Sequence, residues 1–168
     1  MKTDKILATR THKVIYQVGD KVWKVFDTNY PKTDVLNEAL NQARVEETGL
    51  PIPKVHGVTV TEDGNWAIIS DYIEGETLAE KMAKEPENVE KYMKEFVEIQ
   101  LEIHDKTAPL LNKMKDKMSG RINSLKAVNA TTRYELSTRL ESMPKHKKVL
   151  HGDFNPTNVV IGQDGTYY

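Results

Sequence analysis

The spacing of apolar residues along the chain changes character once, close to Gly75. Before this point, short runs rich in β-branched and aromatic residues alternate with turn residues, a pattern typical of strands. After it, apolar residues recur every three or four positions, as on one face of an amphipathic helix. The sequence therefore predicts an α+β fold of two parts, residues 1–75 and 76–168, in which an antiparallel sheet precedes a mostly helical half.

The first part reads as five strands and one inserted helix. Gly19 and Asp20 separate two strand-like runs and predict a tight hairpin between them. The helix is expected at 33–48, with Thr33 or Asp34 as its N-cap. The predicted strands cover residues 5–9, 14–18, 21–26, 55–59 and 66–70.

The second part is helical except at its end. A short helix is expected to begin at Thr77, a longer one covers 87–106, and residues 110–142 are largely helical. Strand-like runs then return near the end of the chain, and they cover residues 149–150, 159–161 and 166–168.

Composition narrows the class of protein. The 168 residues include no cysteine, which excludes a disulfide framework, a thiol nucleophile and a zinc–thiolate site. No apolar run approaches about 18 residues and the first residues lead into no signal peptide, so we expect a cytoplasmic protein that does not enter a membrane. Residues 81–148 carry a net charge of +5. Their lysines alternate with acidic residues as on a solvated helix face, and we therefore expect no nucleic-acid partner.

The most informative stretch is HGDFNPTN at 151–158, between two short apolar runs. Asp153 and Asn158 are five positions apart in a loop that contains Pro156, so both side chains can point into one cavity. A carboxylate beside an amide oxygen offers two hard oxygen ligands suited to Mg²⁺, and the carboxylate can also take a proton from a hydroxyl. The same residue types are common in turns, and Gly152 allows a positive φ, so an ordinary Asx-turn loop explains the spacing equally well.

This loop resembles the catalytic loop of the aminoglycoside phosphotransferase and choline kinase family, which shares the protein-kinase fold. The kinase loop H-R-D-x-x-x-x-N has the same offset between aspartate and asparagine, and Gly152 stands where the arginine would be, as in this family. The resemblance implies a sheet N-lobe, a partial helical C-lobe, and transfer of phosphate from ATP or GTP to a hydroxyl of a small-molecule acceptor. It implies Asp153 as the residue that orients and deprotonates the acceptor, and Asn158 as a Mg²⁺ ligand.

Lys24 lies in a predicted strand that is apolar on both faces, with Val22 and Phe26 on its own face. Such a strand has little reason to place a charge in line with buried residues unless an anion meets that charge. The resemblance implies that Lys24 holds the α- and β-phosphates of ATP and pairs with a helix carboxylate, for which Glu38 is the best match.

The periodicity of the helix at 33–48 argues against Glu38. At about 100° per residue, Glu38 falls opposite the apolar stripe that includes Leu36 and Leu40. Glu46 or Glu47 could therefore take its place as the partner of Lys24.

Two further segments have counterparts in the family. Residues 68–75 resemble its hinge, a strand that leads into the linker between the lobes and would bind adenine through the carbonyl of Asp71 and the N–H of Ile73. The turn at 9–13 occupies the place of the phosphate-facing loop, but it contains no glycine and so is neither a Walker A loop nor a kinase glycine-rich loop. By resemblance, Thr11 and backbone amides would contact phosphate there.

The family's second acidic metal ligand follows the strand that Thr166 begins, and the sequence stops at Tyr168. The chain thus resembles a C-terminally truncated kinase, and we expect it to transfer phosphate poorly by itself. Missing helices would leave apolar surface uncovered, which predicts self-association or reduced stability.

Three other functions are compatible with parts of the sequence. A non-catalytic nucleotide-binding or interaction module, either a pseudokinase or a fragment, would explain the glycine-free turn. A protein kinase is disfavoured because Gly152 replaces the catalytic-loop arginine. A metal-dependent hydrolase that uses His151 and Asp153 lacks further ligands at suitable spacing. The acceptor itself, whether aminoglycoside, choline or sugar, is not identified by the sequence.

Overall fold

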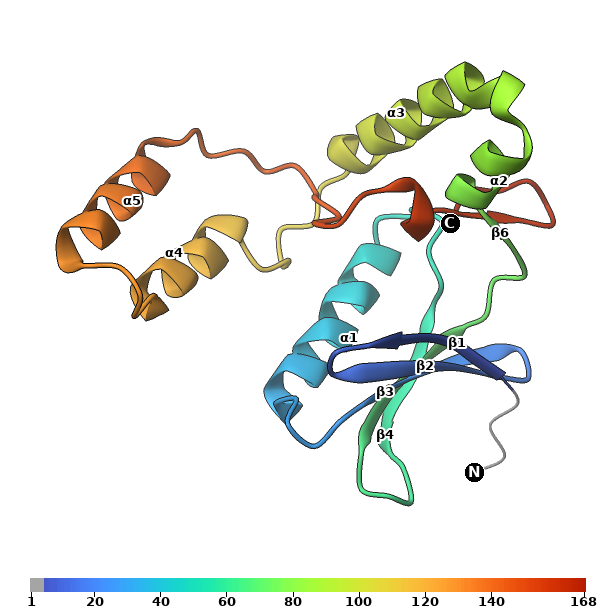
Figure 1. Cartoon of the computed structure of the whole chain (residues 1–168), viewed down its shortest axis with the longest axis horizontal. Coiled ribbons are helices and arrows are strands. Elements are labelled where there is room, and N and C mark those ends of the chain that lie inside the picture. The colour runs from blue at the N-terminus through green and yellow to red at the C-terminus, as the bar shows by residue number, and fades with distance from the viewer. Residues whose placement is uncertain (1–4) are drawn as a thin grey trace.

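The structure is a computed structural model that describes residues 5–168. Five strands form one sheet in the order β1-β2-β3-β5-β4, and every neighbouring pair is antiparallel. One helix, α1 (Lys32–Glu46), packs against this sheet, and the other helices lie beyond it (Figure 1). The predicted α+β class is confirmed. The strands are β1 (Lys5–Arg10), β2 (Lys13–Val18), β3 (Lys21–Phe26), β4 (Val55–Val60) and β5 (Trp66–Asp71).

Helix α1 differs from its prediction at its start and in the face that it buries. It begins at Lys32 with Pro31 as the capping residue and without a side-chain cap, so neither Thr33 nor Asp34 is the N-cap. The rigid ring of a proline fixes φ at a value that suits the start of a helix. The carbonyl of Pro31 accepts the N–H of Asp34 and of Val35, which begins the helical ladder.

The buried face of α1 is centred on Val35 and Ala39 rather than on the predicted stripe. These two side chains pack with Phe26 and Ile68 of the sheet into the first hydrophobic core. Leu36 and Leu40, predicted to be buried, are 42% and 49% exposed. Residues at spacings of three and four share a helix face, so this packing places position 38 on the side of the sheet.

The second half contains four α-helices among the described residues, as its periodicity predicted in outline. Helix α2 begins after Thr77, whose side chain forms a reciprocal capping box with Glu80. Leu78, Tyr92 and Val159 form a second buried core. The helices are α2 (Leu78–Lys84), α3 (Val89–Asp105), α4 (Met114–Ser124) and α5 (Ala130–Ser142), with short 3₁₀ turns at Pro86–Asn88 and Pro156–Asn158.

In this half, the strand predicted at 159–161 is present one position later, the one at 166–168 is reduced to a single bridge, and a strand at 75–77 was not predicted. Strand β6 (Gly75–Thr77) pairs with β7 (Val160–Gly162), and residues 166–168 add a single bridge to β7. A Cβ on Gly75 would lie 2.0 Å from the carbonyl oxygen of Ile161, so this close pairing requires glycine. The predicted strand at 149–150 is wrong: the segment is a loop in which Val149 is buried without a strand partner.

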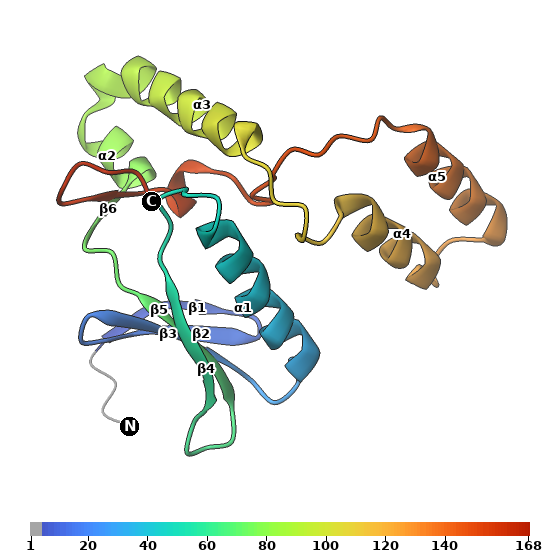
Figure 2. The ribbon, with the colours of Figure 1, turned by 180° about the vertical axis from the view of Figure 1, so that it is seen from behind.

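Helices α4 and α5 contact each other and extend away from the rest of the chain (Figures 1 and 2). Along α3, large apolar side chains at Met93, Val97 and Leu101 are between 43% and 61% exposed. Self-association through such surface stays a prediction. Among the described residues, no helix has the length and apolar character needed to cross a membrane.

Candidate active site

Lys24 and Glu38 meet on the face of the sheet that α1 covers. Lys24 lies in the centre of the sheet, paired with Ile15 on β2 and with Ile68 on β5. Its Nζ is 2.6 Å from Oε1 of Glu38, and both side chains are about one-quarter exposed. The pairing that the resemblance implied is therefore present, and the helix-periodicity argument against Glu38 was wrong because the buried face of α1 was misassigned.

Neither alternative carboxylate takes the place of Glu38. Glu46 accepts a hydrogen bond from the backbone N–H of Val55 at 2.7 Å and so fastens the end of α1 to the start of β4. Glu47 is the C-cap residue of α1, about two and a half turns beyond Glu38.

Sequence reasoning missed a second cation at this carboxylate. The Nζ of Lys13 lies 3.3 Å from the same Oε1 of Glu38. Lys13 pairs with Phe26, two positions from Lys24 on the same strand face, and this cross-strand spacing was the available signal. Burial raises the pKa of Glu38, but the two lysines outweigh it and hold the pKa below its ordinary value. The cluster therefore carries a net charge of +1.

The loop at 151–158 brings Asp153 and Asn158 into contact. The Nδ2 of Asn158 donates to Oδ2 and to the backbone carbonyl of Asp153, each at 2.9 Å. Phe154 stacks on Phe96 of α3 with ring centroids 4.2 Å apart, which anchors the loop on the helical half. The side chain of Asn155 accepts the N–H of Thr157 and so forms an Asx turn, as an ordinary turn loop would. The loop therefore contains both an Asx turn and the Asp153–Asn158 pair.

This orientation leaves Oδ1 of Asn158 without a hydrogen bond within residues 5–168. Oδ1 is the kind of oxygen donor that Mg²⁺ prefers, so Asn158 fits part of a magnesium site. No group of three or more His, Asp or Glu side chains in the described part of the chain is placed to hold a metal ion.

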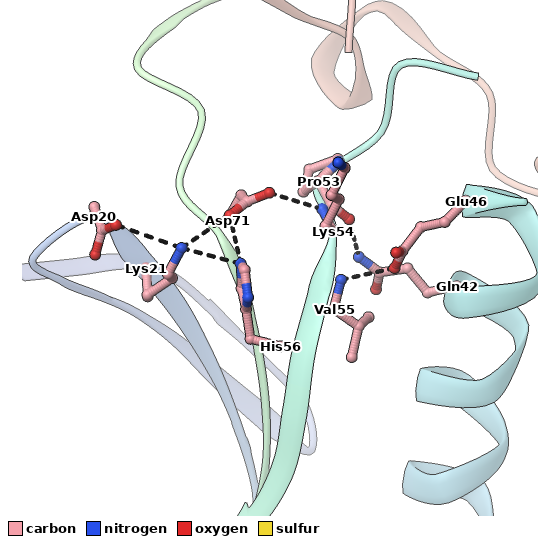
Figure 3. Close-up of polar contacts among 9 residues, drawn as sticks. All are labelled: Asp20, Lys21, Gln42, Glu46, Pro53, Lys54, Val55, His56 and Asp71. Carbon is pink, nitrogen blue, oxygen red and sulfur yellow. Dashed lines mark hydrogen bonds and ion pairs between the residues drawn. The ribbon is translucent and has the colours of Figure 1, made fainter. Parts of the chain in front are cut away.

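Asp71 and Ile73 lie where β5 leads into the linker, residues 72–74, that connects it to β6. Figure 3 shows the carboxylate of Asp71 in contact with both His56 and Lys21, whose side-chain nitrogens also lie 3.0 Å from each other. The hydrogen bond from His56, with smaller contributions from Lys21 and the N–H of Lys54, lowers the pKa of Asp71 to about 2. The backbone N–H of Ile73 has no hydrogen-bond partner among the described residues.

A cleft of about 1460 Å³ separates the sheet and α1 from the 151–158 loop and α4. Its volume exceeds the roughly 300–1,000 Å³ that is typical of small-molecule sites. The predicted residues that line it are Glu38, Asp71, Ile73 and Asn158. Lys24 and Asp153 are each bonded to one of these, whereas Thr11, exposed in the turn between β1 and β2, is not brought to the cleft.

Comparison with known proteins identifies the family. The model of the phosphotransferase enzyme family matches residues 8–167, which is nearly the whole chain. The chain belongs to this family. Among curated proteins, no sequence match was found for this phosphotransferase-family chain.

Solved structures with the same fold include aminoglycoside phosphotransferases. The apo form of a thermostable mutant of aminoglycoside phosphotransferase APH(4)-Ia is 16% identical, with a TM-score of 0.63 over 97% of this chain and 64% of that one. Another thermostable mutant of the same enzyme, in ternary complex with AMP-PNP and hygromycin B, is 16% identical, with a TM-score of 0.61 over 99% and 65%. The predicted protein-kinase-like fold is therefore confirmed, and the chain spans slightly less than two-thirds of the length of these structures.

The low pKa of Asp71 predicts an acid-sensitive contribution to the stability of this family member. The pKa falls from 3.8 to about 2 on folding, so the carboxylate stabilises the fold fully above about pH 5 and loses that effect between about pH 4 and pH 2. We expect Asp71→Asn to lower the free energy of unfolding by about 1 kcal/mol at pH 7, after allowance for solvent screening. Urea unfolding of both proteins between pH 7 and pH 2 measures this difference. A difference that stays constant over that range would contradict the assignment.

Proposed function

We propose that this protein transfers the terminal phosphate of ATP to a hydroxyl of a small molecule, with the nucleotide in the cleft. The observation that carries the proposal is that the Lys24–Glu38 pair and the Asp153–Asn158 pair approach one cleft from opposite halves of the fold. Membership of the phosphotransferase family supports it. The neighbour solved with AMP-PNP and hygromycin B supports ATP as the donor and a small hydroxylated molecule as the acceptor.

Each residue has a role in the proposed reaction. Lys24 neutralises charge on the α- and β-phosphates, and Glu38 holds its ammonium in position. Asp71 and Ile73 bind adenine through backbone groups. Asp153 orients the acceptor hydroxyl and takes its proton as the hydroxyl oxygen attacks the terminal phosphorus, while the bond from that phosphorus to the bridging oxygen breaks and ADP leaves.

Asn158 is the residue that would hold Mg²⁺ through Oδ1. When bound, Mg²⁺ neutralises charge on the phosphate oxygens. The protein itself supplies little covalent chemistry, so most of its contribution is positioning and electrostatic stabilisation.

The remaining predictions belong to the same proposal. Residues 1–75 and 76–168 act as the two lobes that flank the nucleotide, and GTP is the alternative donor. A cytoplasmic location, the lack of a nucleic-acid partner, self-association and slow transfer by these 168 residues alone stay predictions.

The alternative is a non-catalytic nucleotide-binding module. It is favoured by one observation, that Thr11 in its glycine-free turn does not line the cleft. A phosphate-binding role for this turn would need Thr11 or its neighbouring amides to reach the nucleotide.

Calorimetry with ATP, in the presence and absence of Mg²⁺, tests the first step of the proposal, and we expect binding that Mg²⁺ strengthens. Transfer of labelled phosphate to a panel of aminoglycosides, choline and sugars tests the second. Binding followed by transfer supports the phosphotransferase, whereas binding without transfer to any acceptor favours the non-catalytic module. A chain that binds no nucleotide would refute both.

A further inference from the structure

The proposed reaction uses only backbone groups of Asp71, yet its side chain is the centre of a polar cluster. Oδ1 of Asp71 accepts hydrogen bonds from Nε2 of His56 at 2.6 Å and from Nζ of Lys21 at 2.9 Å. Oδ2 accepts the backbone N–H of Lys54 at 3.1 Å. One carboxylate at the end of β5 thereby joins the starts of β3 and β4 (Figure 3).

Backbone hydrogen bonds continue this cluster toward the linker. The N–H of Asp71 donates to the carbonyl of Lys54, and the N–H of Tyr72 donates to the carbonyl of Asp20, both at 3.0 Å. The two residues that precede Ile73 are therefore hydrogen-bonded to Lys54, just before β4, on one side and to the β2–β3 turn on the other.

The segment before β4 is in turn fastened to α1. Nε2 of Gln42 donates to the carbonyl of Pro53 at 2.7 Å, and Glu46 accepts the N–H of Val55 at the same distance (Figure 3). The helix that carries Glu38 is thus connected through residues 53–55 to the carboxylate of Asp71.

Ordinary surface ion pairs contribute little, because each holds two mobile side chains in water. This cluster differs because a side-chain ammonium, an imidazole and a backbone N–H converge on one carboxylate, of which only 29% of the side chain is exposed. Beyond it lies Ile73, which lines the cleft and whose N–H is unpaired among the described residues. A rigid attachment next to a free donor lowers the entropy lost when a ligand binds that donor.

We infer that Asp71 is a positioning residue, whose contacts with Lys21 and His56 hold the linker ready to bind the adenine base. This inference rests on the proposed function, because it assumes that Ile73 meets a nucleotide. It predicts a separable effect: loss of the cluster weakens binding of the base, while the phosphates, held by Lys24 at the centre of the sheet, are bound as before.

Calorimetry with adenosine and with inorganic tripolyphosphate tests the inference on the full chain. Asp71→Ala removes all three hydrogen bonds of the carboxylate, and we expect about tenfold weaker adenosine binding with tripolyphosphate binding within about twofold. His56→Ala removes only one of these three donors, from an exposed position, and should weaken adenosine binding less than Asp71→Ala does. His56→Gln restores an N–H donor and should recover part of the adenosine affinity that His56→Ala loses.

Asp27→Ala is the matched control, because Asp27 has the same kinds of partner as Asp71. Its carboxylate accepts hydrogen bonds from the ring of His12 at 3.0 Å and from the backbone N–H of Asn29 at 2.8 Å. The melting temperature of the Asp27→Ala variant should fall by about as much as that of Asp71→Ala, but the variant should bind adenosine as the unaltered chain does. Unchanged adenosine binding in Asp71→Ala, or equal losses for both ligands, would overturn the positioning role while the proposed function stands. If the unaltered chain bound neither ATP nor adenosine, both would be refuted.

Discussion

Replacing Asp153 with asparagine is expected to slow phosphate transfer by about 10²–10⁴-fold and to leave ATP affinity unchanged. An amide has nearly the same shape as the carboxylate and can still accept the hydrogen bond that Asn158 donates. Asn155 loses its bond to the other carboxylate oxygen but keeps its bond to the backbone carbonyl of residue 153, so the loop should keep its geometry. It cannot take a proton from the acceptor hydroxyl. Single-turnover transfer from labelled ATP, with ATP affinity measured by calorimetry on the same samples, separates chemistry from binding.

Asp164→Asn provides the control for this substitution. Asp164 is also an exposed carboxylate close to the end of the chain, and its hydrogen bonds are to Thr166 and Tyr168 in the turn after β7. Its variant should transfer phosphate at the parental rate. If Asp153→Asn retained that rate, Asp153 would not be the base, and if it lost ATP binding as well, the loop would have a structural role instead.

Replacing Lys24 with methionine is expected to weaken ATP binding by about 10- to 100-fold, because a hydrogen bond to a charged group contributes about 1.5–3 kcal/mol. Adenosine has no phosphate and should bind as before. Glu38 keeps Lys13 as its partner, so the variant should still fold. Calorimetry with ATP, AMP and adenosine measures the effect, which should grow with the number of phosphates.

Lys5→Met is the matched control, since Lys5 is an exposed lysine at the start of β1. It removes the same charge from the same sheet, and ATP affinity should not change. Equal ATP affinities for Lys24→Met and the parent would exclude Lys24 from the phosphate site. Lys13→Met, compared in the same series, shows how much of the remaining affinity depends on the second cation.

The parts of the site that the sequence predicted are those set by short-range geometry. Asp153 and Asn158 lie five positions apart in one loop with turn residues between them, so their contact depends mainly on local turn geometry. Lys24 stood out because it interrupts an apolar strand, and a charge in that position needs a partner wherever the strand packs. The predicted boundaries of β1 to β5 agree with the observed ones to within about one residue, because alternation with a period of two is visible within six residues.

The errors concern contacts between segments that are distant in the sequence. Helix periodicity marked Leu36 and Leu40 as buried, whereas Val35 and Ala39 meet the sheet. The stripe is a property of α1 alone, but the face that packs depends on the shape of the sheet beneath it. Strand β6, residues 75–77, was missed because three residues are too few for a periodic signal, whereas its partner near 159–161 was predicted.

Taken alone, the sequence determined most of the local structures and which loop carries a carboxylate and an amide five positions apart, because backbone geometry and side-chain spacing act within a few residues. Only the tertiary structure decided that Glu38, shared with Lys13, is the carboxylate that meets Lys24, and that Asp71 joins three strands through its side chain. The reason is physical: which helix face and which strand edges come together is settled by packing of the whole core, and no single segment contains that information.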